Sequence, residues 1–354
     1  MTALPDAAWR VSRDVARHLG LGDVQELVPA AGGRLNQNLV ATTPRGRYFL
    51  KGSRYPELET ILKEHQVIAF VATHNIPVVK PLADRAGMTA TRAGNRWWVA
   101  YPWVESDLFA AGGLGTTVAR TIGRTLGALH RVLAEVPVSV SESLPRRPLL
   151  NATEATMREL EARISRNPRP SAYDRHVLAS IAYRRTLISR ESSSHEGFAE
   201  LPTQSLHGDF HMGNLLISRP TRAAELSINA IVDWELTCWG PRVWEVARSA
   251  DLILDLSDDL KDGLQCLREF LSGYMEQASL TSHEAIQLAP FYLASRVQSL
   301  WVIEEHYRRG HAPTDEIVID DFSALDWWFR NGDAVGALAG DLVRSTKFMR
   351  PIVT

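Results

Sequence analysis

The chain has 354 residues and a formal net charge of −2 at pH 7, which gives no support for nucleic acid as the main partner. Its hydrophobic fraction of 45% and charged fraction of 23% are those of an ordinary soluble globular protein that can bury a sizeable core. Two cysteines are too few for a disulfide framework, residues 1–10 lack the pattern of a signal peptide, and no apolar run could span a bilayer. We expect a cytoplasmic protein, monomeric or homodimeric, with no membrane partner.

The first part of the chain predicts one helix followed by short strands. Residues 6–19 have the apolar spacing of an amphipathic helix, and strand-like runs begin at Val24. Gly32 and Gly33 lie between two of these runs, where backbone amides without an intervening side chain can approach a phosphate. The pair is not a G-x-G-x-x-G motif, and an ordinary hairpin turn is the alternative. Its position upstream of a strand-ending lysine favours the phosphate site.

That lysine is Lys51, which closes the apolar run at residues 48–50. A lysine at this place is the natural partner for the α- and β-phosphates of a nucleotide, and a solvated lysine at a strand end is the alternative. Its ammonium then needs a carboxylate to hold it. Residues 56–74 predict a helix that supplies candidates. These candidates are Glu57, Glu59 and Glu64.

Two more strands and a series of helices follow. Residues 76–82 and 96–104 predict the last two strands of a five-stranded sheet, and residues 116–134 predict a helix with a clear apolar stripe. His130 ends that stripe, where a lone histidine is more often a core residue than a catalytic one. Residues 141–204 are rich in arginine interspersed with acids, which favours a solvated surface over a binding patch.

The most informative segment is residues 207–214, His-Gly-Asp-Phe-His-Met-Gly-Asn, which is followed by a second acid at Asp233. Phosphoryl transfer needs one carboxylate to orient the attacking hydroxyl, and an Asn and a second carboxylate to hold magnesium. Asp209, Asn214 and Asp233 match this set. Short apolar runs between Asn214 and Asp233 predict a hairpin that brings these two residues together. A surface turn with local Asp caps is the alternative, but it leaves the second Asp unexplained.

These motifs resemble those of the aminoglycoside phosphotransferase and choline kinase superfamily, which are relatives of the protein kinases. The resemblance runs from about Val24 to the C-terminal helices. It implies a bilobal, protein-kinase-like α+β fold. The N-terminal lobe, residues 1–103, would contain the leading helix, the antiparallel sheet and a second helix. The larger, mainly helical lobe, residues 104–354, would carry catalysis and the acceptor.

The resemblance also implies roles for individual residues. Asp209 is the catalytic base, Glu64 pairs with Lys51, and His207 supports the loop. Adenine is read by one carbonyl and one amide of the connector, and a proline can supply the carbonyl because only an acceptor is needed there. The predicted set is catalytic Asp209, nucleotide-binding Gly32, Gly33, Lys51, Glu64, Pro102 and Val104, and metal-binding Asn214 and Asp233.

Two departures from related patterns bear on the substrate. Asp233 begins Asp-Trp-Glu instead of the D-F-G of protein kinases, which points to the small-molecule branch. Glu245 stands where the family's G-P-x-x-x-D-x-A segment has Asp, an acid that is mostly structural in the family. We assign Glu245 no catalytic role.

We therefore expect a kinase that uses ATP and Mg2+ to phosphorylate a hydroxyl of an amino sugar, an aminoglycoside-type antibiotic or an amino alcohol. A homoserine-kinase-like enzyme, a peptide Ser/Thr kinase and a pseudokinase nucleotide-binding module are the alternatives, and GTP could replace ATP. Aromatic and acidic side chains could form a pocket for a cationic amine, although helix packing and solvated charges explain them equally well. They are Trp234, Trp239, Trp301, Trp327, Trp328, Glu304, Glu305, Asp320 and Asp321.

Overall fold

The chain folds into two compact units in the computed structural model. The first comprises Met1–Ala110, Val132–Glu142 and His207–Cys238, and the second comprises Ala111–Arg131, Ser143–Leu206 and Trp239–Thr354. The described residues are 4–30, 36–55, 57–106, 116–137, 144, 150–191, 197–218, 226–253, 260–310 and 316–349. His207–Cys238 groups with the N-terminal residues, whereas the sequence assigned it to the C-terminal lobe. The lobe boundary between residues 103 and 104 stays a prediction.

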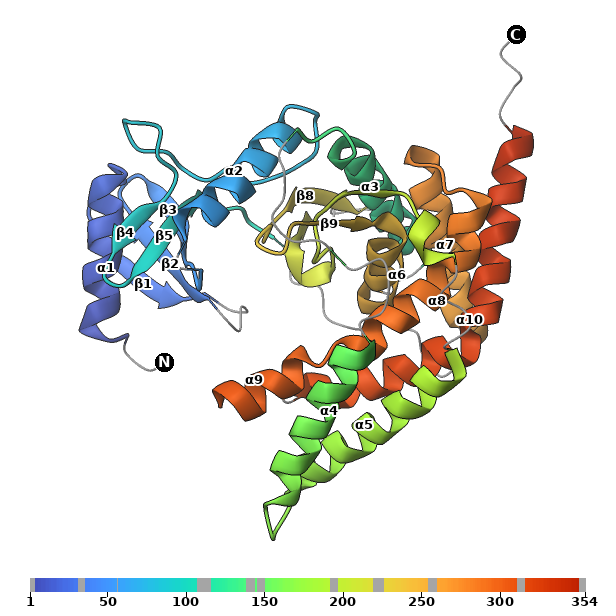
Figure 1. The fold of residues 1–354 in the computed structure, drawn as a ribbon. Helices are drawn as coiled ribbons and strands as arrows, with labels where there is room; N and C mark the ends of the chain where they lie inside the picture. Colours follow the sequence, from blue (N-terminus) through green and yellow to red (C-terminus); the bar gives the residue numbers. More distant parts are fainter. Residues whose placement is uncertain are drawn as a thin grey trace. The chain divides into compact units, whose positions relative to one another are not determined.

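A five-stranded antiparallel sheet forms the N-terminal part of the first unit (Figure 1). The strand order is β1-β2-β3-β5-β4, and each neighbouring pair is antiparallel. The predicted antiparallel sheet is confirmed. Its strands are β1 (Glu26–Pro29), β2 (Gln37–Thr43), β3 (Gly46–Gly52), β4 (Thr91–Ala93) and β5 (Arg96–Pro102).

One strand was predicted in the wrong place. Residues 76–82 were expected to form a strand, but this segment makes just an isolated bridge, from Val78 to Ile231, and one backbone hydrogen bond to β5, from the Leu82 N–H to the Ala100 carbonyl at 2.8 Å. Pro77 and Pro81 explain the difference, because a proline has no N–H to donate to a neighbouring strand. The additional strand of the sheet is β4, which follows later in the chain.

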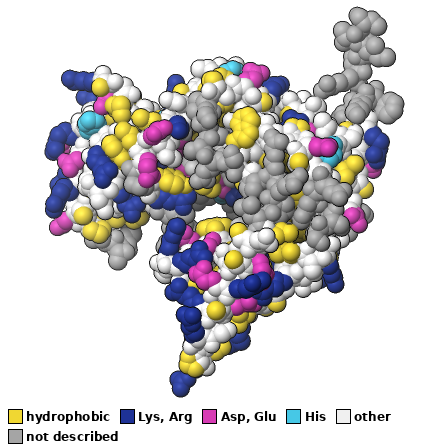
Figure 2. All heavy atoms as spheres, in the orientation of Figure 1, with side chains coloured by type: hydrophobic (Ala, Val, Ile, Leu, Met, Phe, Trp, Pro, Cys, Tyr) yellow, Lys and Arg dark blue, Asp and Glu magenta, His cyan; other side chains and the backbone are white. Residues whose placement is uncertain are grey.

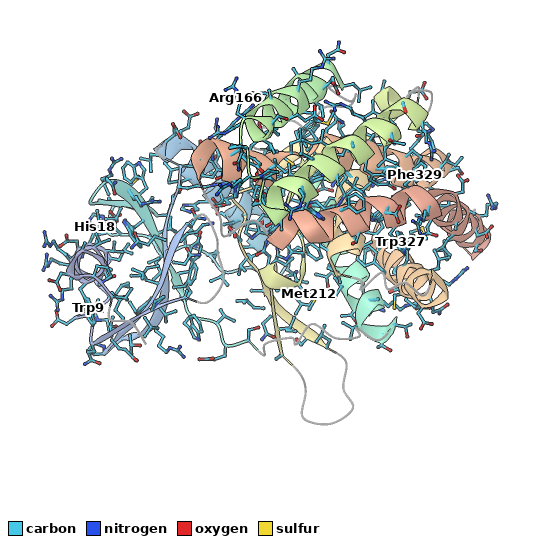
Figure 3. All side chains as sticks on the ribbon, turned by 90° about the horizontal axis from the view of Figure 1, so that it is seen from below. Trp9, His18, Arg166, Met212, Trp327 and Phe329 are labelled. Carbon is cyan, nitrogen blue, oxygen red and sulfur yellow. The ribbon has the colours of Figure 1, made fainter. Side chains whose placement is uncertain are left out.

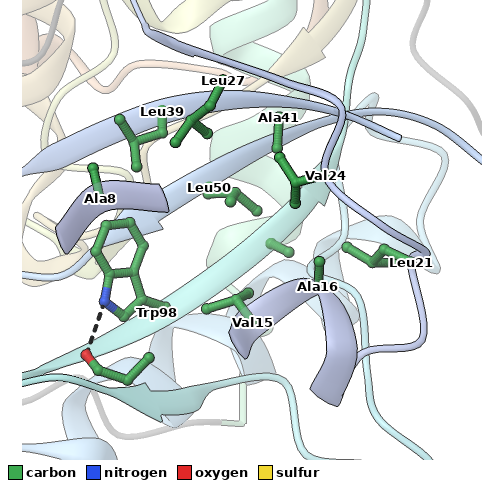
Figure 4. Packing of buried hydrophobic residues seen from close by; sticks show 12 residues of the cluster. Ala8, Val15, Ala16, Leu21, Val24, Leu27, Leu39, Ala41, Leu50 and Trp98 are labelled. Carbon is green, nitrogen blue, oxygen red and sulfur yellow. Dashed lines mark hydrogen bonds between the residues drawn. The ribbon is translucent and has the colours of Figure 1, made fainter. Parts of the chain in front are cut away.

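Helix α1 (Asp6–His18) covers one face of the sheet. Val15 of the helix belongs to the same buried cluster as Leu50 of β3 and Trp98 of β5 (Figure 4). The Trp98 indole donates to the Ala93 carbonyl at 3.2 Å. A Cβ atom on Gly52 would lie 2.9 Å from the Trp98 ring, so a larger residue there would have to displace the indole. This core fixes β3 and β5.

Helix α2 (Leu58–Ala72) packs on the opposite face (Figure 1). Successive strand residues point to opposite faces of a sheet. Leu50 and Trp98 face α1, so their neighbours Lys51 and Val99 face α2. Lys51 and Val99 lie opposite each other in the β3–β5 pair, and Val99 packs against Ile61 of α2. Strand alternation therefore directs the Lys51 side chain to the α2 side of the sheet.

The segment after residue 207 forms the predicted hairpin. A single 3₁₀ turn, η2 (Met212–Asn214), leads into β7 (Leu215–Ser218), which pairs with β8 (Ser227–Ile231) (Figure 3). Leu215 lies opposite Ile231, and the Ile231 N–H donates to the Pro77 carbonyl at 2.8 Å. The residues just before β7 and just after β8 therefore lie at the same end of the hairpin.

The second unit is mainly helical, and together with the sheet it confirms the α+β class. Two short strands, β6 (Thr203–Leu206) and β9 (Cys238–Pro241), pair with each other, and η1 (Phe198–Glu200) precedes β6. Within the described ranges, no helix combines the length and apolar character needed to cross a membrane. The helices are α3 (Thr116–Leu133), α4 (Leu150–Ser165), α5 (Ala172–Glu191), α6 (Arg242–Ile253), α7 (Leu260–Gln277), α8 (Ser282–Gln298), α9 (Trp301–Arg309) and α10 (Glu316–Met349).

His130 of α3 is a buried core residue, as predicted. Its Nε2 lies 2.9 Å from Glu245 Oε2, and its Nδ1 lies 3.0 Å from the Tyr274 hydroxyl. A neutral imidazole satisfies both contacts if Nε2 donates to the carboxylate and Nδ1 accepts from the phenol. Glu245, the acid that replaces the family's Asp, thus has a structural partner inside the second unit.

The arginine-rich helices α4 and α5 carry interspersed basic and acidic side chains on their surface (Figure 2). Arg185 of α5 forms ion pairs with Glu154 at 3.0 Å and Glu161 at 2.5 Å, both on α4. These contacts agree with the expected solvated surface. Arg184 is an exception, because it is buried and donates to the carbonyl groups of residues 296 and 297 at the end of α8.

Candidate active site

His207 joins the two loops of the site. Its side chain is fully buried, and its Nδ1 accepts from the Asp209 N–H at 3.2 Å. The ring proton must then lie on Nε2, which donates to the Val232 carbonyl at 3.2 Å. The ring also packs against the Trp234 indole, with centroids 4.5 Å apart. His207 therefore connects the segment that holds Asp209 to the segment that holds Asp233.

Gly208 allows these two segments to approach each other. Its φ is +84°, a left-handed conformation that glycine adopts without a steric penalty. A Cβ atom at this position would lie 1.9 Å from the Leu236 carbonyl oxygen. Any other residue would force the backbone of the loops apart.

Asp209 and Asn214 contact each other directly. The Asn214 Nδ2 donates to the Asp209 carbonyl at 2.8 Å and to its carboxylate Oδ2 at 3.0 Å. The η2 turn makes this contact possible, because the Asn214 N–H donates to the His211 carbonyl and closes the chain between them. With both amide protons directed at Asp209, Oδ1 is the side-chain atom of Asn214 suited to bind a cation.

His211 is a neighbour of Asp209 to which the sequence interpretation gave no role. Its Nδ1 accepts from the Gly213 N–H at 3.1 Å, so a neutral ring carries its proton on Nε2. That Nε2 lies 3.4 Å from Asp209 Oδ2. The signal for this contact was present in the sequence, since His211 follows Asp209 by two residues.

Asp233 lies at the open end of the hairpin in an unusual backbone conformation. Its φ is +62°, which is uncommon for a residue with a side chain, although Asp tolerates it better than most. The preceding Val232 N–H donates to the Asn214 carbonyl at 3.0 Å. Asp233 and Asn214 are thus brought together, and 38% of the Asp233 side chain is exposed.

Lys51 completes the arrangement from β3. Its ammonium lies 2.5 Å from Asp233 Oδ1 and 3.0 Å from Glu235 Oε2. Burial by itself would lower the pKa of Lys51, but the negative charges of Asp233, Glu64 and Glu235 outweigh it and hold that pKa well above its ordinary value. Lys51 therefore stays charged. The four side chains Lys51, Asp209, Asn214 and Asp233 all belong to the first unit.

Glu64, the predicted partner of Lys51, lies on α2. The ion pairs of Lys51 among the described residues are those with Asp233 and Glu235, and Glu64 acts on it by longer-range attraction. Burial raises the pKa of Glu64 to about 7, with Lys51 opposing the rise and the other two carboxylates adding to it. The pairing of Glu64 with Lys51 stays a prediction.

Sequence interpretation missed the part played by Glu235. Its side chain is 10% exposed and contacts Lys51, and it also accepts from Asn36 Nδ2 at 2.6 Å. The Arg54 Nε lies 3.6 Å from its other carboxylate oxygen. The acid was visible two residues after Asp233, but nothing in the spacing showed which side chains it would meet.

Pro102 ends β5, and Val104 belongs to the connector that follows it. The Trp103 N–H donates to the Arg47 carbonyl at 3.0 Å, so residue 103 is bonded to β3. In an antiparallel pair, neighbouring residues direct their N–H and C=O groups to opposite sides. The Pro102 carbonyl therefore points away from β3, and Val104 follows two residues after the end of β5. Gly32 and Gly33 lie outside the described residues.

The sequence profile of the phosphotransferase enzyme family matches residues 26–276, which is more than half of the chain. The chain belongs to this family. No curated protein matches it in sequence.

Solved structures show that the phosphotransferase has a protein-kinase-like fold. An amicoumacin kinase in complex with AMP-PNP and Ca2+ is 15% identical, with a TM-score of 0.60 over 90% of this chain and 94% of that chain. A spectinomycin phosphotransferase in complex with ADP and spectinomycin is 14% identical, with a TM-score of 0.59 over 94% and 97%. A microcompartment-associated aminopropanol kinase is 15% identical, with a TM-score of 0.62 over 92% and 98%. With the family match, these similarities identify a small-molecule kinase that transfers phosphate to a hydroxyl.

Several members of the predicted aromatic and acidic pocket have other partners in this phosphotransferase. Trp234 and Trp328 are buried, and their indoles donate to the Ile231 carbonyl and to Asp251. Glu304 and Glu305 form ion pairs with arginines one turn further along α9. The side chains of Asp320 and Asp321 lie outside the described residues, Trp327 packs edge-on against Trp328, and Trp239 and Trp301 are exposed. The pocket stays a prediction.

Proposed function

We propose that this phosphotransferase uses ATP and Mg2+ to phosphorylate a hydroxyl group of an amino sugar, an aminoglycoside-type antibiotic or an amino alcohol. The observation that carries the proposal is the gathering of Lys51, Asp209, Asn214 and Asp233 in one unit, although Lys51 and its ion-pair partner Asp233 are 182 positions apart in the sequence. Phosphoryl transfer depends on positioning and on charge stabilisation, and these side chains supply both.

The donor atoms at the end of the hairpin fit a magnesium ion. Asn214 offers an amide oxygen and Asp233 a carboxylate, and Mg2+ prefers oxygen ligands while keeping several waters and phosphate oxygens. Asn214 and Asp233 would therefore hold the ion. When bound, Mg2+ supplies positive charge that offsets the charge of the β- and γ-phosphates.

Asp209 is the proposed catalytic base. Asn214 fixes one of its carboxylate oxygens, and its side chain is 20% exposed, so an acceptor can reach it. The hydroxyl proton of the acceptor passes to the Asp209 carboxylate while the oxygen forms its bond to the γ-phosphorus. The bond from that phosphorus to the leaving oxygen of ADP breaks, and the bonding electrons stay with ADP.

The remaining predicted residues would bind the nucleotide. Lys51 has the permanent charge needed to contact the α- and β-phosphates, and Gly32 and Gly33 would let backbone amides approach them. On the edge of adenine, the outward-pointing Pro102 carbonyl suits one donor, and the Val104 amide suits one acceptor. Glu64 would add negative charge behind Lys51.

The acceptor class is supported by the names of the similar structures. The names of the aminopropanol kinase and of a Plasmodium vivax ethanolamine kinase indicate amino alcohols as acceptors. Those of the amicoumacin kinase and the spectinomycin phosphotransferase indicate antibiotics. The test is ADP release with amino sugars, aminoglycosides, amino alcohols, homoserine and choline, each compared with a reaction lacking acceptor. Release that depends on one of the first three classes supports the proposal. Transfer to peptides alone, or nucleotide binding without transfer to any acceptor, contradicts it.

A further inference from the structure

Glu235 receives contacts from three separate parts of the first unit. Lys51 approaches from β3, Arg54 from just beyond β3, and Asn36 from the residue directly before β2. Asn36 is itself held twice, because its Oδ1 accepts from the Arg54 N–H at 2.9 Å while its Nδ2 donates to Glu235. In the sequence, Asn36 follows the segment with Gly32 and Gly33. One carboxylate thus connects the proposed phosphate lysine to the end of the glycine segment.

Glu235 differs from the other carboxylate that contacts Lys51. The Asp233 side chain is 38% exposed and is the proposed magnesium ligand, so its charge would be shared between the metal and Lys51. The Glu235 side chain is 10% exposed, and solvent screens its ion pair less. Glu235 is therefore the carboxylate that can stay with Lys51 while Asp233 serves a cation.

The turn that carries Glu235 is held on both sides. The Trp234 indole donates to the Ile231 carbonyl at 3.1 Å, and the Thr237 N–H donates to the Trp234 carbonyl at 3.0 Å. Gly208 packs so closely on the next residue, Leu236, that no Cβ atom fits between them. A side chain on such a turn has a fixed origin, which a positioning residue requires.

We propose that Glu235 is a positioning residue for the phosphotransfer reaction. It holds the Lys51 ammonium and the Asn36 side chain in fixed positions relative to the turn that carries Asp233, the proposed metal ligand. The inference rests on the proposed function. It assigns the direct contact that positions Lys51 to Glu235, at the end of the hairpin, although the buried charge of Glu64 on α2 attracts Lys51 more strongly at longer range.

The first test compares charge removal at the three acids. Glu235→Gln keeps an oxygen to accept from Asn36 but removes the charge that holds Lys51. We expect it to lower kcat/KM for ATP by about 10–100-fold, the usual range for residues that support a metal-nucleotide site, with KM for the acceptor unchanged. Glu64→Gln should lose less. The matched control is Glu59→Gln, which should behave as wild type. Glu59 is an exposed acid on α2, the helix that also carries Glu64, and it forms an ion pair with Lys63.

The second test is a double-mutant cycle measured by the Kd for ATP with Mg2+. Lys51→Met and Glu235→Gln act on one contact, so Glu235→Gln should change the Kd far less in the Lys51→Met background than in the wild type. Additive effects, or a larger kcat/KM loss in Glu64→Gln than in Glu235→Gln, would overturn the inference. Thermal unfolding of each variant confirms that the compared proteins are folded.

The two proposals fail in different ways. A wild-type protein that binds ATP but phosphorylates no acceptor contradicts the proposed function and leaves the binding cycle interpretable. A wild type that phosphorylates an amino alcohol while Glu235→Gln retains full kcat/KM for ATP contradicts only the role of Glu235.

Discussion

Each unit holds a cluster of ionisable side chains, and the two clusters satisfy their charges differently. In the second unit, the side chains of His130 and Glu245 are 0% and 1% exposed and satisfy each other together with Tyr274. In the first unit, Lys51 is 9% exposed, but its partner Asp233 is 38% exposed. The cluster in the first unit is open to solvent, and the cluster in the second unit is closed.

The number of acids in each cluster separates the two further. One acid faces one imidazole in the second unit, whereas Asp233, Glu235 and Glu64 surround the single ammonium of Lys51 in the first. Asp233 has an exposed carboxylate that can bind a cation, and its left-handed backbone stores strain; both features are typical of functional sites. A buried pair that satisfies its hydrogen bonds internally is typical of a structural role. Burial alone does not distinguish the two roles.

The largest effect is expected in the first unit, when the proposed catalytic base Asp209 is replaced. Asp209→Asn should lower kcat by about 10²–10⁴-fold, the usual range for a lost general base, while the Kd for ATP stays near the wild-type value. Acceptor-dependent ADP release and nucleotide titration measure the two quantities. Asp84→Asn, a substitution in a surface turn, is the control. Full turnover by Asp209→Asn would remove Asp209 from the mechanism.

A somewhat smaller effect is expected at the exposed carboxylate of the same cluster. Asp233→Ala should weaken binding of ATP in the presence of Mg2+ by about 10–100-fold, because one of the two proposed protein ligands of the ion is lost. The Kd for ATP without Mg2+ should change much less. A magnesium titration identical to that of the wild type would show that Asp233 does not bind the metal.

The closed cluster should respond in stability and not in turnover. Glu245→Ala leaves the buried His130 Nε2 without its acceptor, which should lower the free energy of unfolding by about 1–3 kcal/mol. Glu245→Gln keeps an acceptor of similar shape and should lose less. Chemical denaturation gives both values. A large fall in kcat per folded molecule, with unchanged stability, would place Glu245 in the active site instead.

How much of the fold and the site could be predicted from the sequence depends on how far apart the interacting residues are along the chain. Asp209 and Asn214 are five residues apart, and their local turn follows from the motif itself. The hairpin that brings Asn214 to Asp233 was visible in two apolar runs. The choice between Glu64 and Glu235 as the ion-pair partner of Lys51 was not, because it depends on how close a distant turn comes to β3. The strand predicted at residues 76–82 was wrong because its hydrophobic pattern outweighed two prolines that cannot donate to a sheet.

The smallest expected effect tests how far the charge of Lys51 reaches. Burial, with the positive charge of Lys51 adding to it, lowers the pKa of His65 to about 4, and its Nδ1 contacts the Thr89 hydroxyl at 2.6 Å. As the pH falls from about 6.5 towards 4, the unfolded chain binds a proton at this position and the folded protein does not. The stability that a neutral His65 provides is therefore present above that window and is lost within it.

His65→Gln should remove this component and flatten the pH dependence of the unfolding free energy by on the order of 2 kcal/mol between pH 6.5 and 4. Lys51→Met should shift the profile in the same direction as His65→Gln but by less, since burial is the larger cause. Parallel profiles for wild type and His65→Gln would mean that His65 binds protons equally in the folded and unfolded states. The charge of Lys51 would then have no effect on His65.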